Sequence, residues 1–250
     1  MKSEYIGLLT TLLLGIFILI GTLIAFLAKK RQKIIDFSLA LAFSVIIMLI
    51  VFDLLPEISE LLSLKYIWLF LIGVVVGYVL LKVLDNFIPD HNDNKMNNKE
   101  LKENLAHIGI VSSIALVIHN IIEGMAVYQT VLSSSTTGLM LAIGVGFHNL
   151  PLGMVIATTF YQANQSKKKT LIATCAISLS TLLGGVIMFL LNNQTVNSVL
   201  LGTLLSITLG MLLYIAFSEL YPRVKKVKYK AARNIGILLG IIIMIISILI

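Results

Sequence analysis

The sequence predicts an all-α, polytopic membrane protein: a single transmembrane domain over residues 1–250 with eight spanning helices. Two observations predict this class. Hydrophobic residues make up 58% of the chain and charged residues only 12%, which is more apolar surface than a water-soluble domain of this length buries. In addition, the basic residues gather in alternate connections between apolar runs, which is the pattern of membrane topology signals.

Eight apolar runs follow one another along the chain, and each is close to the roughly 20 residues that cross a bilayer core. They cover residues 6–28, 34–55, 66–84, 106–127, 137–160, 170–191, 196–220 and 234–250. Interior Gly and Pro residues do not exclude spanning helices, because neighbouring helices can satisfy the freed backbone groups. The longest connection, residues 85–105, is polar and Asn-rich, and we expect a variable, flexible cytoplasmic loop there.

The connections also predict the orientation. Of the 19 Lys and Arg residues, only Lys2 and Lys65 lie on one side of the predicted membrane. The others lie in or beside alternate connections on the opposite side, which the positive-inside rule assigns to the cytoplasm. Both termini are then expected outside. The basic residues are Lys29, Lys30, Arg31, Lys33, Lys82, Lys95, Lys99, Lys102, Lys167, Lys168, Lys169, Arg223, Lys225, Lys226, Lys228, Lys230 and Arg233.

Ionisable residues interrupt the fourth and fifth runs. The fourth contains His-Asn-Ile-Ile-Glu-Gly at residues 119–124, and the fifth contains His-Asn-Leu-Pro-Leu-Gly at 148–153. His119 and Glu123 are four residues apart and therefore share one helix face. An imidazole and a carboxylate together suit Zn²⁺, Fe²⁺ or Mn²⁺, and such groups in hydrocarbon are costly without a partner or ligand.

Further ligands must come from other side chains, because one helix offers only two. His148 on the next run is the main candidate, and Asn120 and Asn149 offer side-chain oxygens. The alternative is structural: a hydrogen-bonded His–Glu pair that joins helices, with the Asn side chains in interhelical hydrogen bonds. Two His-Asn motifs on consecutive runs favour the metal site.

Pro151 predicts a kink in the fifth helix, because proline cannot donate a hydrogen bond to the carbonyl of Phe147. A freed carbonyl at membrane depth is a ready cation ligand, as in the broken helices of transporters. The alternative is a kink that serves packing alone.

Acidic residues mark the ends of two other runs. Asp53 and Glu57 are four residues apart near the outer end of the second run, and we interpret them as an entrance for cations or, equally, as solvated helix-end charges. Glu219 closes the seventh run at the cytoplasmic end, where it either marks the exit or is an interfacial acid near Arg223.

At these residues the sequence resembles the ZIP family of divalent metal transporters. The family's helix 4 signature matches residues 119–124, its helix 5 signature matches 148–153, and weaker matches lie at 53–57 and 218–222. The resemblance covers the whole chain. It implies a 3+2+3 bundle in which helices 1–3 and 6–8 form inverted repeats around helices 4 and 5, with alternating access to a midplane site.

Two positions depart from the family pattern. Leu152 stands where members usually carry Glu in helix 5, and Thr181 stands at the acidic position of helix 6. Both missing carboxylates belong to the paired metal centre that the resemblance implies. We therefore expect one metal site, formed by His119, Asn120, Glu123, His148 and Asn149, with altered metal preference or weaker affinity.

The predicted function is uptake of zinc, iron or manganese into the cytoplasm. One alternative is a non-transporting relative that acts as a membrane metal sensor or scaffold. An intramembrane metalloenzyme is a weak second alternative, because no His-Glu-x-x-His pattern occurs and no enzymatic activity is expected.

We expect no cofactor apart from the transported ion. The expected partners are that divalent ion and the lipid bilayer, with a homodimer as a candidate assembly. Nucleic acid is excluded by the distribution of the net charge of +7. The Lys-, Ile- and Asn-rich composition indicates an AT-rich bacterium, and hence a multi-pass protein of the inner (cell) membrane.

Overall fold

A computed structural model describes residues 3–27, 32–86, 98–163, 166–191 and 197–249 of the chain. The side chains at 86, 98–108 and 161–162 lie outside the described set. Within it the chain is helical, without strands, and eight helices are long and apolar enough to cross a membrane. The predicted fold class is confirmed. The inverted repeat and the external position of the termini stay predictions.

The eight spans are built from ten α-helices. Six spans are single helices, and the other two are each interrupted by a π-helical segment. The single helices are α1 (Ser3–Leu27), α4 (Ile67–Asn86), α5 (Asn98–Ser133), α6 (Ser135–Gln162), α7 (Lys167–Leu190) and α10 (Lys230–Leu249). The interrupted spans are α2 (Gln32–Leu49) with α3 (Leu55–Leu61), and α8 (Ser198–Tyr214) with α9 (Tyr221–Lys225).

The π-helical segments extend two spans beyond their predicted ends. Ile50–Leu54 joins α2 to α3, and Ile215–Leu220 joins α8 to α9. A proline follows each segment, Pro56 in the first turn of α3 and Pro222 in the first turn of α9. Proline is tolerated in a first turn, where its missing N–H has no intrahelical partner to lose. The helices therefore continue to Leu61 and Lys225 instead of ending near residues 55 and 220.

The connection expected at residues 85–105 is shorter than predicted. Helix α4 continues to Asn86 and α5 begins at Asn98, so residues 98–105 are helical. The polar composition of this segment suggested a loop, but a helix that projects beyond the bilayer into water needs no apolar face there. Residues 87–97, which include His91, lie outside the described residues.

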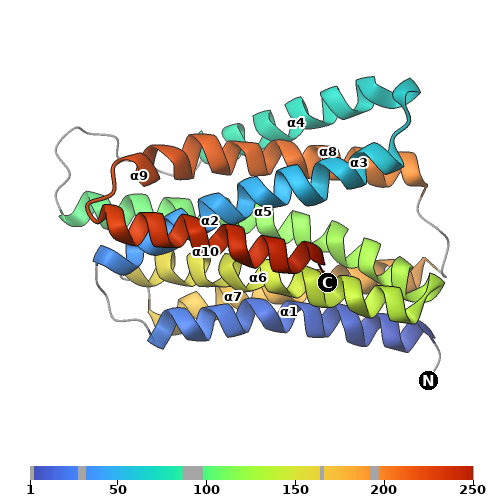
Figure 1. Ribbon diagram of the computed structural model, residues 1–250, viewed down its shortest axis with the longest axis horizontal. Helices are drawn as coiled ribbons and strands as arrows, with labels where there is room; N and C mark the ends of the chain where they lie inside the picture. Colours follow the sequence, from blue (N-terminus) through green and yellow to red (C-terminus); the bar gives the residue numbers. More distant parts are fainter. Residues whose placement is uncertain (1–2, 28–31, 87–97, 164–165, 192–196, 250) are drawn as a thin grey trace.

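The helices form two packing groups (Figure 1). Helices α1, α5, α6 and α7 pack against one another, while α10 packs on α2 and α4 packs on α8. Contacts of α2 and α10 with α6, and of α5 with α8, join the groups. Gly77 lets α4 approach α8 closely, because a Cβ atom there would collide with the carbonyl oxygen of Ile207.

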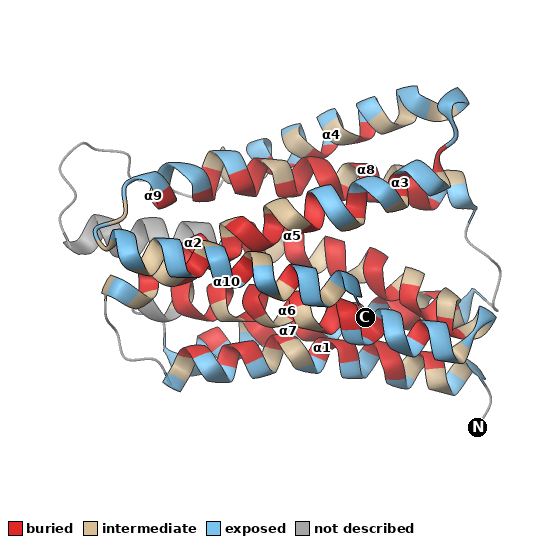
Figure 2. Ribbon diagram, in the orientation of Figure 1, coloured by how far each residue is buried: buried red, intermediate tan, exposed pale blue. Residues whose placement is uncertain are grey.

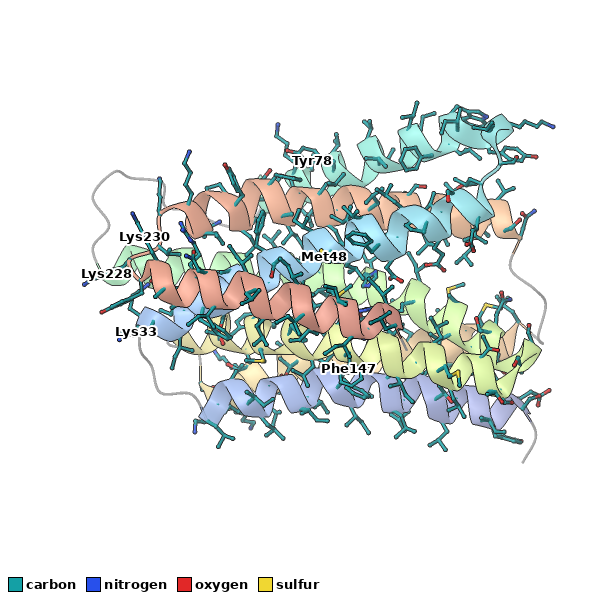
Figure 3. The ribbon with its side chains drawn as sticks, viewed as in Figure 1. Lys33, Met48, Tyr78, Phe147, Lys228 and Lys230 are labelled. Carbon is teal, nitrogen blue, oxygen red and sulfur yellow. The ribbon has the colours of Figure 1, made fainter. Side chains whose placement is uncertain are left out.

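The apolar surface is distributed as expected for a protein in lipid. Buried faces point into the bundle, whereas α4 exposes large hydrophobic side chains along most of its length (Figure 2). The labelled residues Lys33, Lys228 and Lys230 lie together at one end of the bundle, where α2 and α10 begin (Figure 3). The connection between α3 and α4 lies at the opposite end. The two ends therefore differ in charge as the sequence predicts.

Candidate metal centre

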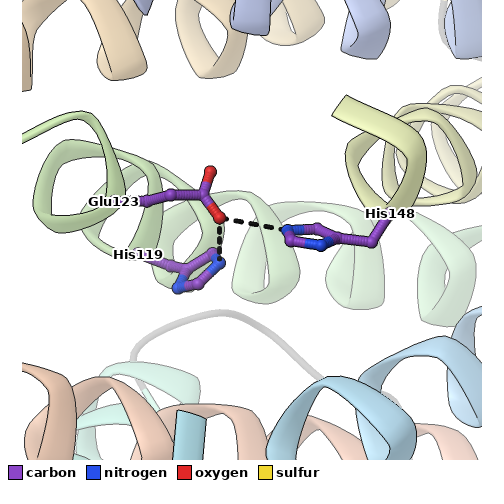
Figure 4. A group of neighbouring side chains, drawn as sticks. All are labelled: His119, Glu123 and His148. Carbon is purple, nitrogen blue, oxygen red and sulfur yellow. Dashed lines mark hydrogen bonds and ion pairs between the residues drawn. The ribbon is translucent and has the colours of Figure 1, made fainter. Parts of the chain in front are cut away.

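Glu123 of α5 is the centre of a cluster of buried ionisable side chains. Its Oε1 atom lies 3.4 Å from Nε2 of His119 and 3.0 Å from Nε2 of His148 (Figure 4). His119 comes from the preceding turn of α5, and His148 comes from α6, which packs directly on α5. All three residues are buried, and both helices place the cluster near the middle of their spans.

The spacing of these atoms matches the coordination shell of a small cation. The candidate ligand atoms of His119, Glu123 and His148 lie within 4.8 Å of one another. Ligands at about 2.0–2.1 Å from a tetrahedral zinc ion lie roughly 3.4 Å apart, close to the two distances at Glu123. Two imidazoles and a carboxylate form a ligand set that zinc accepts. The three side chains would need to move little to bind such an ion, so the cluster is a candidate metal centre.

The two asparagines orient the cluster. Nδ2 of Asn149 donates a hydrogen bond to Oε2 of Glu123 at 3.2 Å, and Nδ2 of Asn120 donates to the carbonyl oxygen of Ile177 on α7 at 3.1 Å. Asn120 thus makes the interhelical contact that was the alternative to metal ligation. Both amides turn their nitrogens to these partners, so their oxygens are left for another group.

Several buried polar atoms of the cluster have no hydrogen-bond partner within the described residues. The distance from His119 to Glu123 fits an ion pair, but neither ring nitrogen of His119 has a hydrogen bond. The same holds for Oδ1 of Asn120 and Oδ1 of Asn149. Buried polar groups in native proteins are nearly always satisfied, so unpaired donors and acceptors that converge indicate a site for a ligand.

Leu152 and Thr181 are both buried and uncharged. Leu152 lies one turn after His148 and is buried. The backbone of Thr181 on α7 lies against Gly124, where any Cβ atom would collide with the Thr181 carbonyl oxygen. Thr181 is fully buried, and its Oγ1 has no hydrogen-bond partner in the described part of the chain. Both positions that depart from the family pattern therefore carry apolar or neutral residues, and the Thr181 backbone lies against the residue that follows Glu123.

A cleft of about 300 Å³ leads to the cluster from the side of α3. His119 and Glu123 lie in its wall together with Asp53, Glu57 and Glu60. The two predicted entrance residues, Asp53 and Glu57, are half-buried, and Glu60 is exposed. Glu60 was not among the predicted site residues, although its spacing from Glu57 puts it on the same helix face. Three carboxylates thus share one cleft with the candidate metal centre.

At the opposite end of the molecule, the acidic residue has a cationic partner. Glu219 is buried, and its Oε2 lies 2.8 Å from Nη1 of Arg223. Nearby, the Tyr214 hydroxyl donates to Oδ2 of Asp85 at 2.6 Å, and the hydroxyls of Tyr78 and Ser218 lie 3.1 Å apart. These contacts join α4 to the end of α8 and to the π-helical segment that follows it. At the predicted exit, the structure therefore shows Glu219 in an ion pair with Arg223.

Comparison with known proteins agrees with the fold and the motifs. The family profile described as "ZIP Zinc transporter" matches residues 89–248. A protein named zinc transporter ZupT from Clostridium perfringens is 26% identical, over 100% of this chain and 97% of its own length. A protein of the same name from Chlorobium phaeovibrioides is 29% identical, over 100% of this chain and 99% of its own. Together with eight membrane-spanning helices, these matches show that the chain is a multi-pass membrane protein that belongs to the ZIP family of metal transporters.

Proposed function

We propose that this protein imports a divalent transition metal, with zinc as the first candidate, by alternating access through a site at His119, Asn120, Glu123, His148 and Asn149. The observation that carries the proposal is the convergence of two imidazoles on one buried carboxylate, beside unpaired side-chain oxygens, at the base of a cleft. The two relatives described above are named zinc transporters, which supports zinc over iron and manganese.

The charges of the cleft favour cations. Asp53, Glu57 and Glu60 have no ion-pair partner within the described residues, and they share the cleft wall with His119 and Glu123. Carboxylates in a cleft with low-dielectric walls raise the local concentration of cations. At the centre, Glu123 offsets part of the hydration that the dication loses, and the imidazoles replace water as neutral ligands.

We infer that the path beyond the centre is closed. On the side away from the cleft, Leu152, Val155 and Ile156 of α6 and Ala115 and Leu116 of α5 belong to one buried apolar cluster. An ion at Glu123 therefore reaches the acidic side and is separated from the basic side by packed side chains. We assign this arrangement to the outward-facing state of the transporter, since the basic loops mark the cytoplasm.

Release into the cytoplasm requires this apolar seal to open while the cleft closes. The site lies on α5 and α6, which belong to the group with α1 and α7, whereas Asp53 and Leu205 in the cleft wall belong to the other group. Displacement of one group against the other would change access to the site without breaking either group's own packing. The last acid on the route is Glu219, with its charge balanced by Arg223 in the closed state.

Uptake into proteoliposomes tests this function. The wild-type protein should show saturable zinc uptake, and Glu123→Ala should abolish it, because no other carboxylate lies in the cluster. Ser44→Ala is a matched control: this buried hydroxyl donates only to the Leu41 carbonyl of its own helix, so uptake should persist. Normal uptake by Glu123→Ala would remove the site from α5, and no uptake by the folded wild type would favour a sensor or scaffold.

A further inference from the structure

The junction between α2 and α10 holds a cluster of cations that the transport site does not use. Lys33 of α2 lies with its Nζ atom 5.3 Å from the centre of the Tyr229 ring, and Nζ of Lys228 lies 5.8 Å from the same ring. Each cation gains from the ring face, but the two ammonium groups repel each other. Lys33, Lys228 and Lys230 are exposed, and they gather at one end of the bundle (Figure 3).

The backbone of this junction is fixed in place. Asp36 is almost completely buried, and its Oδ2 accepts a hydrogen bond from the backbone N–H of Tyr229 at 2.7 Å. Its other oxygen accepts from Nε2 of Gln32 at 2.9 Å. Because both oxygens of Asp36 are engaged and buried, this carboxylate holds the segment before α10 against α2. The aromatic ring and its two lysines are therefore presented by a fixed backbone.

The positive charge of the cluster is not neutralised within the described residues. No carboxylate there forms an ion pair with Lys33, Lys228 or Lys230, and the side chain of Arg233 donates to the neutral side-chain oxygen of Asn234. Lys230 and Arg233 also lie in the first turn of α10, which contains no acidic residue. Cations are unfavourable there, because the N-terminus of a helix is itself positive. An anion is the group that would remove this repulsion.

Directly beyond the cations, α10 presents an apolar surface to the surroundings. Ile235, Leu238 and Ile242 are exposed, with 59%, 60% and 43% of their surface accessible. A ligand that matches both parts needs an anionic head and a hydrocarbon chain of membrane length. We propose that the junction of α2 and α10 binds an anionic phospholipid of the cytoplasmic leaflet, with the headgroup phosphate at Lys33 and Lys228 and an acyl chain along α10.

The membrane context favours a phospholipid over a free anion. Juxtamembrane cations are attracted to anionic lipids of the cytoplasmic leaflet, and each contributes about a fivefold gain in affinity. Tyrosine is enriched at this level of a bilayer, where its ring is apolar and its hydroxyl is hydrated. The site is independent of Glu123, so its occupancy can be measured without transport.

Thermal unfolding of the full-length protein in detergent tests the proposal. Added phosphatidylglycerol should raise the unfolding temperature, whereas phosphatidylcholine with the same acyl chains and inorganic phosphate should not. The double variant Lys33→Gln, Lys228→Gln should need about 25-fold more phosphatidylglycerol for half of the shift. The charge-conserving variant Lys33→Arg, Lys228→Arg should behave as the wild type and shows that folding is intact.

Lys65 provides a matched control at the other end of the molecule. Its Nζ atom also lies over a tyrosine ring, 5.6 Å from the centre of Tyr66, but no second lysine among the described residues shares that ring. Lys65→Gln should leave the lipid titration unchanged. The proposal is overturned if the double glutamine variant titrates as the wild type, if Lys65→Gln weakens binding equally, or if inorganic phosphate alone gives the same shift.

Discussion

The two interrupted spans have the same local backbone design but differ in the charge that follows their acidic residue. Each contains a π-helical segment followed by a proline, and each segment carries one acid, Asp53 in the first case and Glu219 in the second. Four residues after Asp53 stands a second acid, Glu57, whereas four residues after Glu219 stands Arg223. The residue at this position decides whether the acid is left for a cation in the cleft or is already neutralised by the protein.

π-helical segments occur often at functional sites, because the wider turn changes the direction of the side chains that follow. In this molecule both segments place an acid where a path through the bundle would begin or end. A π-helical segment followed by a proline therefore does not by itself make an ion site. The same backbone arrangement carries two acids without an ion-pair partner among the described residues, Asp53 and Glu57, at one end. At the other end it carries the ion pair of Glu219 and Arg223.

The largest effect is expected from adding unpaired acids at the centre itself. The double substitution Leu152→Glu, Thr181→Glu should raise the metal stoichiometry from one ion per chain to two, because both positions are buried, Leu152 one turn after His148 and Thr181 with its backbone against Gly124. Each new carboxylate at membrane depth costs a few kcal/mol without a ligand, so metal should stabilise this variant more than the wild type. Metal analysis and thermal unfolding with and without zinc measure both effects.

Two ions in the wild type would contradict this account of the centre, as would an unchanged single ion in a folded double variant. Leu152→Met with Thr181→Val serves as the uncharged control, because it alters side-chain shape without adding a carboxylate. Its stoichiometry should equal that of the wild type.

A second experiment converts the outer end to the pattern of the inner end. Glu57→Arg puts a cation four residues after Asp53, as Arg223 stands after Glu219, and it changes the charge of the cleft by two units. At an effective dielectric constant of about 20, each unit changes zinc capture by roughly tenfold, so KM for uptake should rise about 100-fold. Glu57→Gln changes the charge by one unit and should raise KM about tenfold. A wild-type KM in Glu57→Arg would exclude the cleft as the entrance.

The smallest effect is expected at the inner end. Arg223→Gln leaves Glu219 buried and unpaired, but Arg223 keeps about a quarter of its side chain exposed, which screens the pair. The free energy of unfolding should fall by about 1 kcal/mol, or the unfolding temperature by roughly 2–4 °C for a chain of this size. Adding Glu219→Gln should recover part of it. If the double variant is as unstable as the single one, Arg223 stabilises the end by some other contact.

Hydropathy was sufficient for the eight spans, because a bilayer imposes length and apolarity on every spanning helix. It failed at the ends of helices. Pro56 and Pro222 look like stop signals in sequence, yet π-helical segments before them let both spans continue. Residues 98–105 looked like a loop, because a helix that projects into water has no hydrophobic pattern to reveal it.

The candidate site divides in the same way. The spacing of His119 and Glu123 placed them on one face, but the approach of His148 to the same oxygen depends on how α5 and α6 pack. The Glu219–Arg223 pair follows from i, i+4 spacing and needed no fold. The contacts of Asp36 with Tyr229 and of Asp85 with Tyr214 join residues far apart in sequence, so no local pattern predicts them.

The contact between Gly124 and Thr181 has a consequence for how metal nuclearity changes in evolution. Backbone touches backbone at this level, and one turn further along Gly184 of α7 meets the Ile121 carbonyl of α5 in the same way. Two helices that interlock at both glycines cannot drift apart when a nearby side chain is replaced. The frame for a second metal site would therefore persist in a chain that lacks the two acids. One-ion and two-ion descendants of such a frame are separated by a few codon changes and by no rebuilding of the backbone.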